Sequence, residues 1–148
     1  MKQHENHLQV ALDEAISSVT EGGMPFGAAL VIDGQVVAKA RNRQLQDNAY
    51  FSHAETNCLM PFLTRPLSND TDAVLYATEA PCPMCAGATL ISGIRKVVVG
   101  ENQHYAGAID WLRQEGIEVV VLDDPACIQL VTDFKQNHPE KWNRYSAG

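Results

Sequence analysis

The 148-residue chain lacks the features that would assign it to a membrane or secreted class. No apolar run approaches the roughly 20 residues that a helix needs to span a bilayer. The first residues, MKQHENHLQ, contain no apolar segment of the kind found in secretory signals. Four cysteines are also too few for a small disulfide-stapled scaffold. These absences predict no membrane association and a reduced, cytoplasmic setting.

Positive charge is scarce as well. The chain has 11 Lys and Arg against 18 Asp and Glu, which gives a formal net charge of −7. Proteins that bind long polyanions gather Lys and Arg in patches, because neutralising phosphates supplies much of their affinity. Here the basic residues are scattered along the sequence. We therefore expect no nucleic-acid partner, and a small-molecule substrate fits the charge balance better.

The N-terminal segment has the spacing of an amphipathic helix that ends at two glycines. Its apolar face is expected to hold Leu8, Leu12, Ala15, Ile16 and Val19. Two short apolar runs then flank Asp33-Gly34, a dipeptide typical of two-residue hairpin turns. The sequence therefore predicts one helix followed by two antiparallel strands.

Beyond the hairpin, helical and strand patterns alternate. Ser52 is a candidate N-cap for a short helix that Pro61 and Pro66 confine. Strands are expected in AVLYAT, KVVVGE and IEVVVLD, and helices in PMCAGATLISG, AIDWLRQEG, PACIQLVTDFKQ and the tail HPEKWNRYSAG. This order predicts an α/β fold, a three-layer α/β/α arrangement with a mixed five-stranded sheet. No linker or repeat interrupts it, so residues 1–148 are expected to form one domain.

The segment PCPMC places Cys82 and Cys85 three positions apart. Such a C-x-x-C pair by itself is compatible with half a zinc site, a redox pair or two core cysteines. A thioredoxin-like redox pair is the weaker alternative, because that motif follows the first strand of its fold and this one follows the third expected strand. His53, at the expected start of another helix, adds an imidazole, and Zn²⁺ accepts imidazole together with thiolates.

Two thiolates and one imidazole make three protein ligands and leave the fourth tetrahedral position open, as in catalytic zinc sites. The ligand groups lie at expected helix starts, where the helix dipole and free backbone N–H groups favour thiolate over thiol. A structural zinc would need a fourth protein ligand, from Cys58 or Cys127. Cys58, however, lies on the helix body five residues after His53. The sequence therefore favours a catalytic zinc.

Glu55 lies two residues after His53, so on a helix it points away from that ligand. It can stand beside the open metal position, take a proton from metal-bound water and return it to a leaving group. Zinc lowers the pKa of its bound water to about 7, which makes hydroxide available at neutral pH. A glutamate in the first turn of a helix more often serves only to interact favourably with the helix dipole. The catalytic interpretation depends on the combination of these residues.

Together, H-A-E and P-C-P-M-C resemble the H-x-E and P-C-x-x-C motifs of zinc-dependent nucleobase and nucleoside deaminases. With EGGMPFGAALV, ARNR, KVVVGEN, EVVVLDD and HPEKW, the chain resembles the fungal-type cytosine deaminases over nearly its whole length. PCPMCAGA also resembles guanine deaminases and tRNA adenosine deaminases. The resemblance implies a cytidine deaminase-like fold, hydrolytic release of ammonia and a homodimer. It assigns one catalytic Zn²⁺ per subunit to His53, Cys82 and Cys85, and proton transfer to Glu55.

The same resemblance implies where a base would bind. Asn42, in ARNRQ, matches an asparagine that hydrogen-bonds the base in this family. The alternative for Asn42 is a turn residue that ends the second strand. The backbone around Ala54 and Ala80 is also expected to contact the base. These contacts would hold a flat heterocycle against the metal.

Aromatic side chains suit the walls of such a site, because they stack on a flat ring and need no charged group to bind it. The candidates are Phe26, Tyr105 and Trp142. Phe26 could equally be a core residue at a strand start. Trp142 matches a tail tryptophan that closes the pocket in the cytosine deaminases, and its alternative role is docking of the tail.

The tail contains one departure from the cytosine deaminases. An Asp that reads the base is replaced by Tyr145, three residues after Trp142. An ionised carboxylate only accepts hydrogen bonds, whereas a phenol can donate or accept. The expected activity is therefore deamination of a free pyrimidine-like base, of cytosine or isocytosine type. A guanine, related purine or triazine deaminase is the alternative, then a tRNA adenosine deaminase, and last a zinc-stabilised binding module without catalysis.

Overall fold

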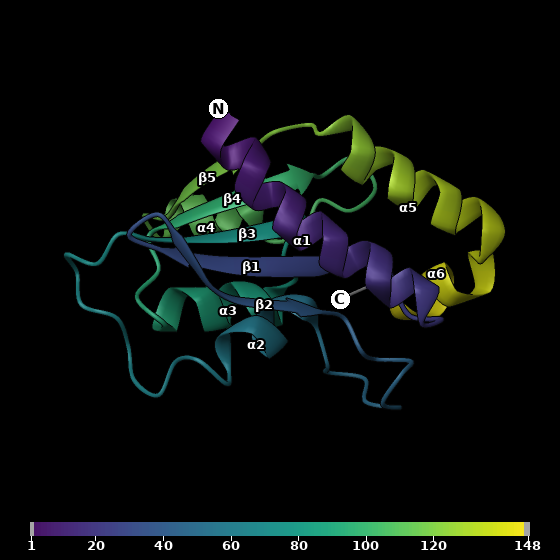
Figure 1. Cartoon of the computed structure of the whole chain (residues 1–148), viewed down its shortest axis with the longest axis horizontal. Helices are drawn as coiled ribbons and strands as arrows, with labels where there is room; N and C mark the ends of the chain where they lie inside the picture. The colour runs from purple at the N-terminus through teal and green to yellow at the C-terminus, as the bar shows by residue number, and fades with distance from the viewer. Residues whose placement is uncertain (1, 147–148) are drawn as a thin grey trace.

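The computed structural model describes residues 2–146, which form one mixed five-stranded sheet with helices on both faces (Figure 1). The strands are β1 (Gly27–Ile32), β2 (Gln35–Arg41), β3 (Ala73–Glu79), β4 (Lys96–Glu101) and β5 (Glu118–Val121). Their spatial order is β2-β1-β3-β4-β5. β1 runs antiparallel to β2 and to β3, whereas β3, β4 and β5 are parallel. The predicted α/β class and mixed five-stranded sheet are confirmed.

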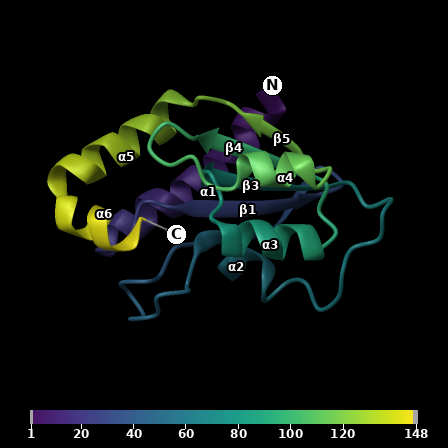
Figure 2. The ribbon, with the colours of Figure 1, turned by 180° about the vertical axis from the view of Figure 1, so that it is seen from behind.

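Six helices are distributed over the two faces of the sheet among the described residues: α1 (Lys2–Thr20), α2 (Ala54–Leu59), α3 (Pro83–Ile91), α4 (Ile109–Gln114), α5 (Pro125–Asn137) and α6 (Pro139–Tyr145). In Figure 1, α1 crosses in front of the sheet with α5 beside it. Figure 2 shows α2, α3 and α4 on the opposite face. The short helix α6 turns back from the end of α5. The three-layer arrangement is the predicted one.

The central strands are buried on both faces because helices cover both faces of the sheet. Successive side chains of a strand point to opposite sides, so they enter two different cores. In β4, Val97 and Val99 enter the core beneath α2, α3 and α4, while Val98 enters the core beneath α1 and α5. Tyr76 and Leu75 divide in the same way on β3. The two cores fix the register of the sheet, since a shift by one residue would exchange every side chain between them.

The hairpin between β1 and β2 turns at Asp33 and Gly34 with φ values of 51° and 80°. Positive φ at both central residues is the geometry of the tightest hairpin turn, and glycine adopts it without steric cost. The turn joins Ile32 directly to its partner Gln35. The sequence prediction for this hairpin is confirmed.

The predicted N-cap of α2 is wrong by one residue. His53, in an extended conformation with φ −92° and ψ 153°, precedes the first helical residue, and its side chain makes no capping bond. The Oγ atom of Ser52 instead accepts a hydrogen bond from Asn57 Nδ2 at 2.9 Å. The imidazole is turned towards two cysteines. The His53 side chain therefore faces the site and does not accept a hydrogen bond from the free backbone N–H groups at the start of α2.

The buried face of α1 also differs from the prediction at Ile16, whose side chain is exposed. Its expected place is taken by the polar residues Glu14 and Ser18, which are both buried. Glu14 forms an ion pair with Arg41 at 3.1 Å, and Ser18 Oγ donates to the backbone oxygen of Asn42 at 2.9 Å. These bonds tie the end of α1 to the end of β2. They also satisfy the polar groups that burial would otherwise penalise.

The carboxyl ends of β3 and β4 meet at one edge of the sheet, with Glu79 opposite Glu101 in the parallel register. In open α/β sheets this edge is where ligands bind. The starts of α2 and α3 reach the same edge, and the site described below lies there. No helix within residues 2–146 has both the length and the apolar character needed to cross a membrane.

Candidate active site

His53, Cys82 and Cys85 come together although 29 and 32 residues separate the histidine from the two cysteines. Nδ1 of His53 lies 3.4 Å from Sγ of Cys82 and 3.5 Å from Sγ of Cys85. All three ligand atoms lie within 4.8 Å of one another. A tetrahedral ion with Zn–S of about 2.3 Å and Zn–N of about 2.0 Å would separate sulfur from nitrogen by about 3.5 Å. The donor set and its spacing fit a zinc ion.

The local sequence of α3 explains how one helix end presents both sulfurs. Pro83 occupies the first turn, where its missing N–H has no helical partner in any case. Cys82 is the N-cap residue, and its Sγ accepts from the backbone N–H of Cys85 at 3.5 Å. A hydrogen bond from the thiol of Cys85, followed by the imidazole of His53 and the backbone N–H of Cys85, lowers the pKa of Cys82 to about 4 against the effect of burial. This helix start favours the thiolate that a metal requires.

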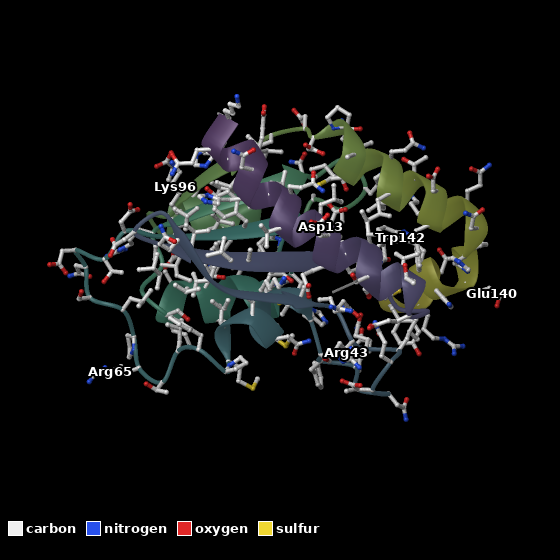
Figure 3. All side chains as sticks on the ribbon, viewed as in Figure 1. Asp13, Arg43, Arg65, Lys96, Glu140 and Trp142 are labelled. Atoms are coloured by element: carbon white, nitrogen blue, oxygen red, sulfur yellow. The ribbon has the colours of Figure 1, made fainter. Side chains whose placement is uncertain are left out.

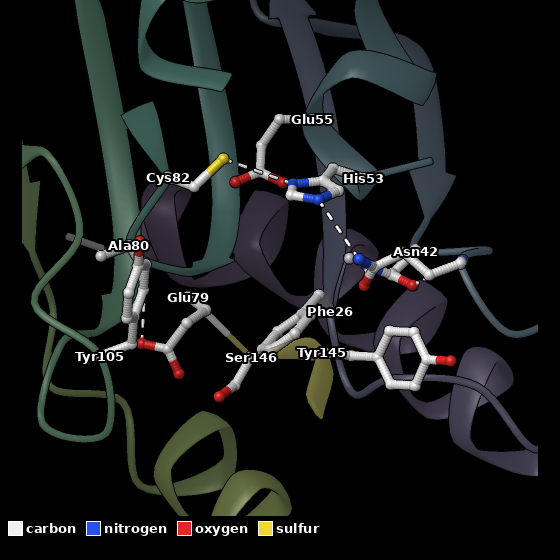
Figure 4. Close-up of a pocket in the computed structure, with 12 residues that line it drawn as sticks. Phe26, Asn42, His53, Glu55, Glu79, Ala80, Cys82, Tyr105, Tyr145 and Ser146 are labelled. Atoms are coloured by element: carbon white, nitrogen blue, oxygen red, sulfur yellow. Dashed lines mark hydrogen bonds between the residues drawn. The ribbon is translucent and has the colours of Figure 1, made fainter. Parts of the chain in front are cut away.

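The carboxyl group of Glu55, in the first turn of α2, lies beside the metal ligands (Figure 4). Glu55 is buried, and burial raises the pKa of its carboxyl to about 7. The structure brings Glu55 and the three ligand side chains to one place, as the sequence predicted. A carboxyl group whose pKa lies near neutrality can both accept and return a proton.

Glu55 and His53 face a pocket whose mouth and interior together comprise about 390 Å³ (Figure 4). The pocket is lined by Phe26, Gly27, Asn42, Gln44, His53, Glu55, Glu79, Ala80, Cys82, Tyr105, Tyr145 and Ser146. These residues come from β1, the loops after β2 and β4, the starts of α2 and α3, the end of β3 and the C-terminal helix.

Asn42 is held by a reciprocal pair of hydrogen bonds with Gln44. Its Nδ2 donates to Gln44 Oε1 at 2.8 Å, and its Oδ1 accepts from the Gln44 backbone N–H at 2.9 Å. The Gln44 amide also donates to the backbone oxygen of Tyr50 and lies 3.5 Å from Nε2 of His53. This chain of amides fixes the imidazole from the side away from the metal ligands, a common support for metal-binding histidines.

The aromatic candidates fall into two groups. Phe26 and Tyr105 line the pocket, as predicted. Trp142 does not line it. It lies behind Phe26 with 6.0 Å between ring centroids, in a core with Met24 and Phe134. The reason is that α6 docks on α5, which turns the indole inward, so its effect on the pocket is to support the Phe26 wall.

Two of the remaining candidates line the pocket and one lies behind it. Ala80 and Tyr145 belong to the lining, and the Tyr145 ring also contacts Tyr50 with 6.4 Å between centroids. Ala54 is fully buried behind the lining residues. The tail residue that replaces a carboxylate therefore does reach the pocket.

Sequence reasoning missed four lining residues: Gly27, Gln44, Glu79 and Ser146. Glu79 carried a usable signal, because it is a charged residue at the end of an otherwise apolar strand, three positions before Cys82. The ends of parallel strands are binding positions in such sheets. Gln44 and Ser146 lie in polar surroundings of the sequence, and no periodic pattern distinguishes them.

Known proteins resemble the chain in sequence and in structure. The family model described as the cytidine and deoxycytidylate deaminase zinc-binding region matches residues 1–101. A cytosine deaminase from Candida albicans is 38% identical over 137 residues, covering 92% of this chain and 91% of that protein. A tRNA-specific adenosine deaminase from Bacillus subtilis is 37% identical over 102 residues, covering 68% of this chain and 63% of that protein. A solved guanine deaminase from Nitrosomonas europaea has a TM-score of 0.73 at 26% identity, covering 85% of this chain and 81% of that chain.

Proposed function

The chain belongs to the cytidine and deoxycytidylate deaminase family, and on that premise we propose that it hydrolytically deaminates a free nucleobase-like amino heterocycle. The proposed ring is a pyrimidine of cytosine or isocytosine type, and the products are ammonia and the corresponding oxo-heterocycle. The observation that carries the proposal is the three-ligand cluster with Glu55 beside it, opening into a pocket lined by polar and aromatic side chains.

His53, Cys82 and Cys85 would hold the zinc, one per subunit. The chemistry that zinc supplies when bound is activation of a water molecule for attack on the amino-bearing carbon. Glu55 takes a proton from the attacking water and delivers it to the departing amine. Its buried position excludes competing bulk water from this transfer.

The remaining pocket residues would orient the ring. The amide of Asn42 is pre-positioned by Gln44, so it can pair with the edge of a base without losing freedom on binding. Phe26 and Tyr105 offer aromatic surface to the faces and edge of the ring. These contacts are polar or aromatic rather than cationic, which fits a neutral substrate.

A free base is a better fit than a base within RNA. The labelled basic residues Arg43, Arg65 and Lys96 lie far apart in Figure 3, and Arg43 forms an ion pair with Asp47 at 2.9 Å. Residues 145 and 146 of the C-terminal segment line the pocket, so this segment covers part of it. Scattered and neutralised positive charge provides little attraction for a phosphate backbone.

A guanine or related purine is the second candidate. The likeness to the Nitrosomonas europaea guanine deaminase favours it, and so does Tyr145 at the position where the cytosine deaminases that the chain resembles have an aspartate. A substrate panel separates the two candidates. Ammonia release is measured with zinc-loaded enzyme on cytosine, isocytosine, guanine, adenine and amino-triazines. Release from a pyrimidine supports the first proposal, release from guanine alone supports the second, and silence across the panel refutes both.

We further propose that two copies of the chain associate through the α2–α3 face. Met60 and Ile91 are about three-quarters exposed there, at 74% and 75%, and the neighbouring surface of Leu59, Leu63 and Ala88 is apolar. Contiguous exposed apolar surface of this kind marks an interface. Sedimentation as a dimer supports this proposal, and a monomer at micromolar concentration refutes it.

A cytoplasmic location is also proposed. The four cysteines are all unpaired and buried, and two of them form the metal cluster. Oxidation of Cys82 and Cys85 would remove the thiolates that hold the ion, so function needs a reducing compartment. Fractionation of expressing cells tests this location.

A further inference from the structure

Glu79 and Glu101 form a buried pair of carboxyl groups at the edge of the sheet. They are directly opposite in the parallel register of β3 and β4, and side chains at paired positions project from the same face. Glu79 is 5% exposed and Glu101 is 0% exposed. Two carboxyl groups held this close and away from water do not both ionise, because the charges repel without solvent to screen them.

The hydrogen bonds around the pair indicate where the proton lies. Glu101 Oε1 accepts from the backbone N–H groups of Gln103 at 2.8 Å and His104 at 3.3 Å, and such bonds favour a charged carboxylate. Glu79 Oε1 accepts one backbone bond, from Ala80 at 3.3 Å. Among residues 2–146, the Oε2 atom of each glutamate has no partner. One proton carried by Glu79 and donated to Glu101 satisfies both orphaned oxygens.

The electrostatic surroundings agree with this assignment. Burial, followed by the adjacent Glu101, raises the pKa of Glu79 to about 11. Glu55, Tyr105 and the Cys127 thiol are titratable groups that interact electrostatically with the pair, and none of these three is a cation. The backbone N–H of Ala80 favours the ionised form of Glu79, but burial and the adjacent Glu101 outweigh it and raise its pKa.

Glu79 also lines the pocket, and Figure 4 shows its carboxyl near Tyr105 and Ser146, away from His53 and Glu55. A carboxyl group whose proton is directed to Glu101 offers only lone pairs to a ligand. Among the described lining residues, Glu55 and Glu79 are the two with carboxyl groups, so Glu79 is the acidic acceptor remote from the metal cluster.

We propose that Glu79 selects free bases by accepting a hydrogen bond from a ring N–H that lies across the ring from the carbon losing its amine. This inference rests on the proposed deaminase function. In cytosine the atom in that position is N1–H. In cytidine the same nitrogen carries the sugar, and in isocytosine the corresponding position is a C–H. Glu79 therefore favours a cytosine-type free base over isocytosine and over nucleosides.

The test compares a substrate that has this N–H with one that lacks it. Zinc-loaded wild type, Glu79→Leu and Glu79→Gln are assayed for ammonia release from cytosine, 1-methylcytosine and isocytosine. In wild type, kcat/KM for cytosine should exceed that for 1-methylcytosine. Glu79→Leu should lose roughly 10- to 100-fold on cytosine, because the N–H is left unpaired in a buried pocket, and its preference over 1-methylcytosine should shrink.

Glu79→Gln separates hydrogen bonding from bulk. Its amide can donate to Glu101 and still present an oxygen to the base, so it should recover most of the preference that Glu79→Leu loses. Calorimetric binding of the same rings to a Glu55→Gln background gives a second measurement that does not depend on turnover. Glu79→Met replaces Glu79→Leu if the leucine variant does not fold.

The outcomes distinguish this inference from the proposed function. An unchanged ratio of cytosine to 1-methylcytosine in the apolar variant, with ammonia still released, overturns the role of Glu79 and leaves the deaminase intact. A Gln variant no better than the apolar one likewise overturns it. No ammonia from any ring with wild type refutes the proposed function itself.

Discussion

Replacing Glu79 by glutamine should make the protein more stable, and increasingly so as the pH rises. The physical reason is the proton that the folded protein must retain on Glu79. The unfolded chain releases that proton above the ordinary glutamate pKa of 4.5, whereas the folded protein holds it up to a pKa of about 11. Between these limits the folded state binds more protons than the unfolded state, so the free energy of unfolding falls as pH rises.

The size of the effect follows from the pH interval above the ordinary pKa. Each pH unit in this window costs about 1.4 kcal/mol. The free energy of unfolding of the wild type is therefore lowered by on the order of 4 kcal/mol at about pH 7.5 and by on the order of 1 kcal/mol at about pH 5.5. Glutamine has no proton to retain and can still donate to Glu101. The stabilising effect of Glu79→Gln should thus grow by on the order of 3 kcal/mol between the two pH values.

The measurement is urea-induced or thermal unfolding of wild type and Glu79→Gln at both pH values, with zinc present throughout. For a domain of this length, the melting-temperature difference between the proteins should widen by roughly 5–10 °C. Any pH dependence of the zinc cluster is common to both proteins and cancels. Glu115→Gln, on an exposed residue, is the matched control and should shift neither curve. Parallel pH profiles for wild type and Glu79→Gln would refute the shared-proton arrangement.

Three other outcomes are expected. Glu55→Gln should retain zinc, measured by elemental analysis, and lose kcat by roughly 10²- to 10⁴-fold because the proton carrier is gone; activity near wild type would remove Glu55 from the reaction. Tyr145→Asp, on the pocket wall, should raise the kcat/KM ratio of cytosine over isocytosine by roughly 10-fold, and an unchanged ratio would reduce Tyr145 to packing. Ile91→Lys should shift sedimentation towards monomer because it places charge in the apolar α2–α3 face, whereas Glu115→Lys should not.

The proposed role of Glu79 in binding the base gives a reason for keeping an arrangement that lowers stability. A buried carboxyl pair lowers stability at neutral pH, and a glutamine at the same position would remove that cost. Binding sites commonly sacrifice stability in this way for a group that a ligand needs. The predicted stabilisation concerns the proton between Glu79 and Glu101 and is measured by unfolding. The predicted change in selectivity concerns the hydrogen bond that Glu79 accepts from the base and is measured by substrate preference.

The elements of the fold could be read from the sequence because their signals are local. The Asp33-Gly34 turn, Pro83 and Pro125 at helix starts, and the apolar runs of β3 and β4 each determine a segment through backbone geometry and side-chain periodicity. Where polar side chains formed long-range bonds, the local pattern failed. Ile16 is exposed because Glu14 and Ser18 bond to residues of β2 and beyond, and no spacing rule within α1 contains that information.

The residues of the site likewise fall into those that a local motif identifies and those that only the tertiary structure places. His53, Glu55, Cys82 and Cys85 were identified from two short motifs, since metal ligands of these types at helix starts already define a donor set. The other residues that line the pocket could not be identified in this way, because they depend on how separate strands and the C-terminal tail are placed in space. Trp142 was expected at the pocket and lies behind Phe26, because α6 docks on α5.

By itself, the sequence determined the order of helices and strands, the three candidate metal ligands and the neighbouring acid. Only the tertiary structure decided that Glu79 and Glu101, 22 residues apart, would lie opposite each other, buried and each with an unpartnered Oε2 atom. Periodicity and motif spacing act within one element. The meeting of two strand ends depends on sheet order and register, which the packing of both cores sets together.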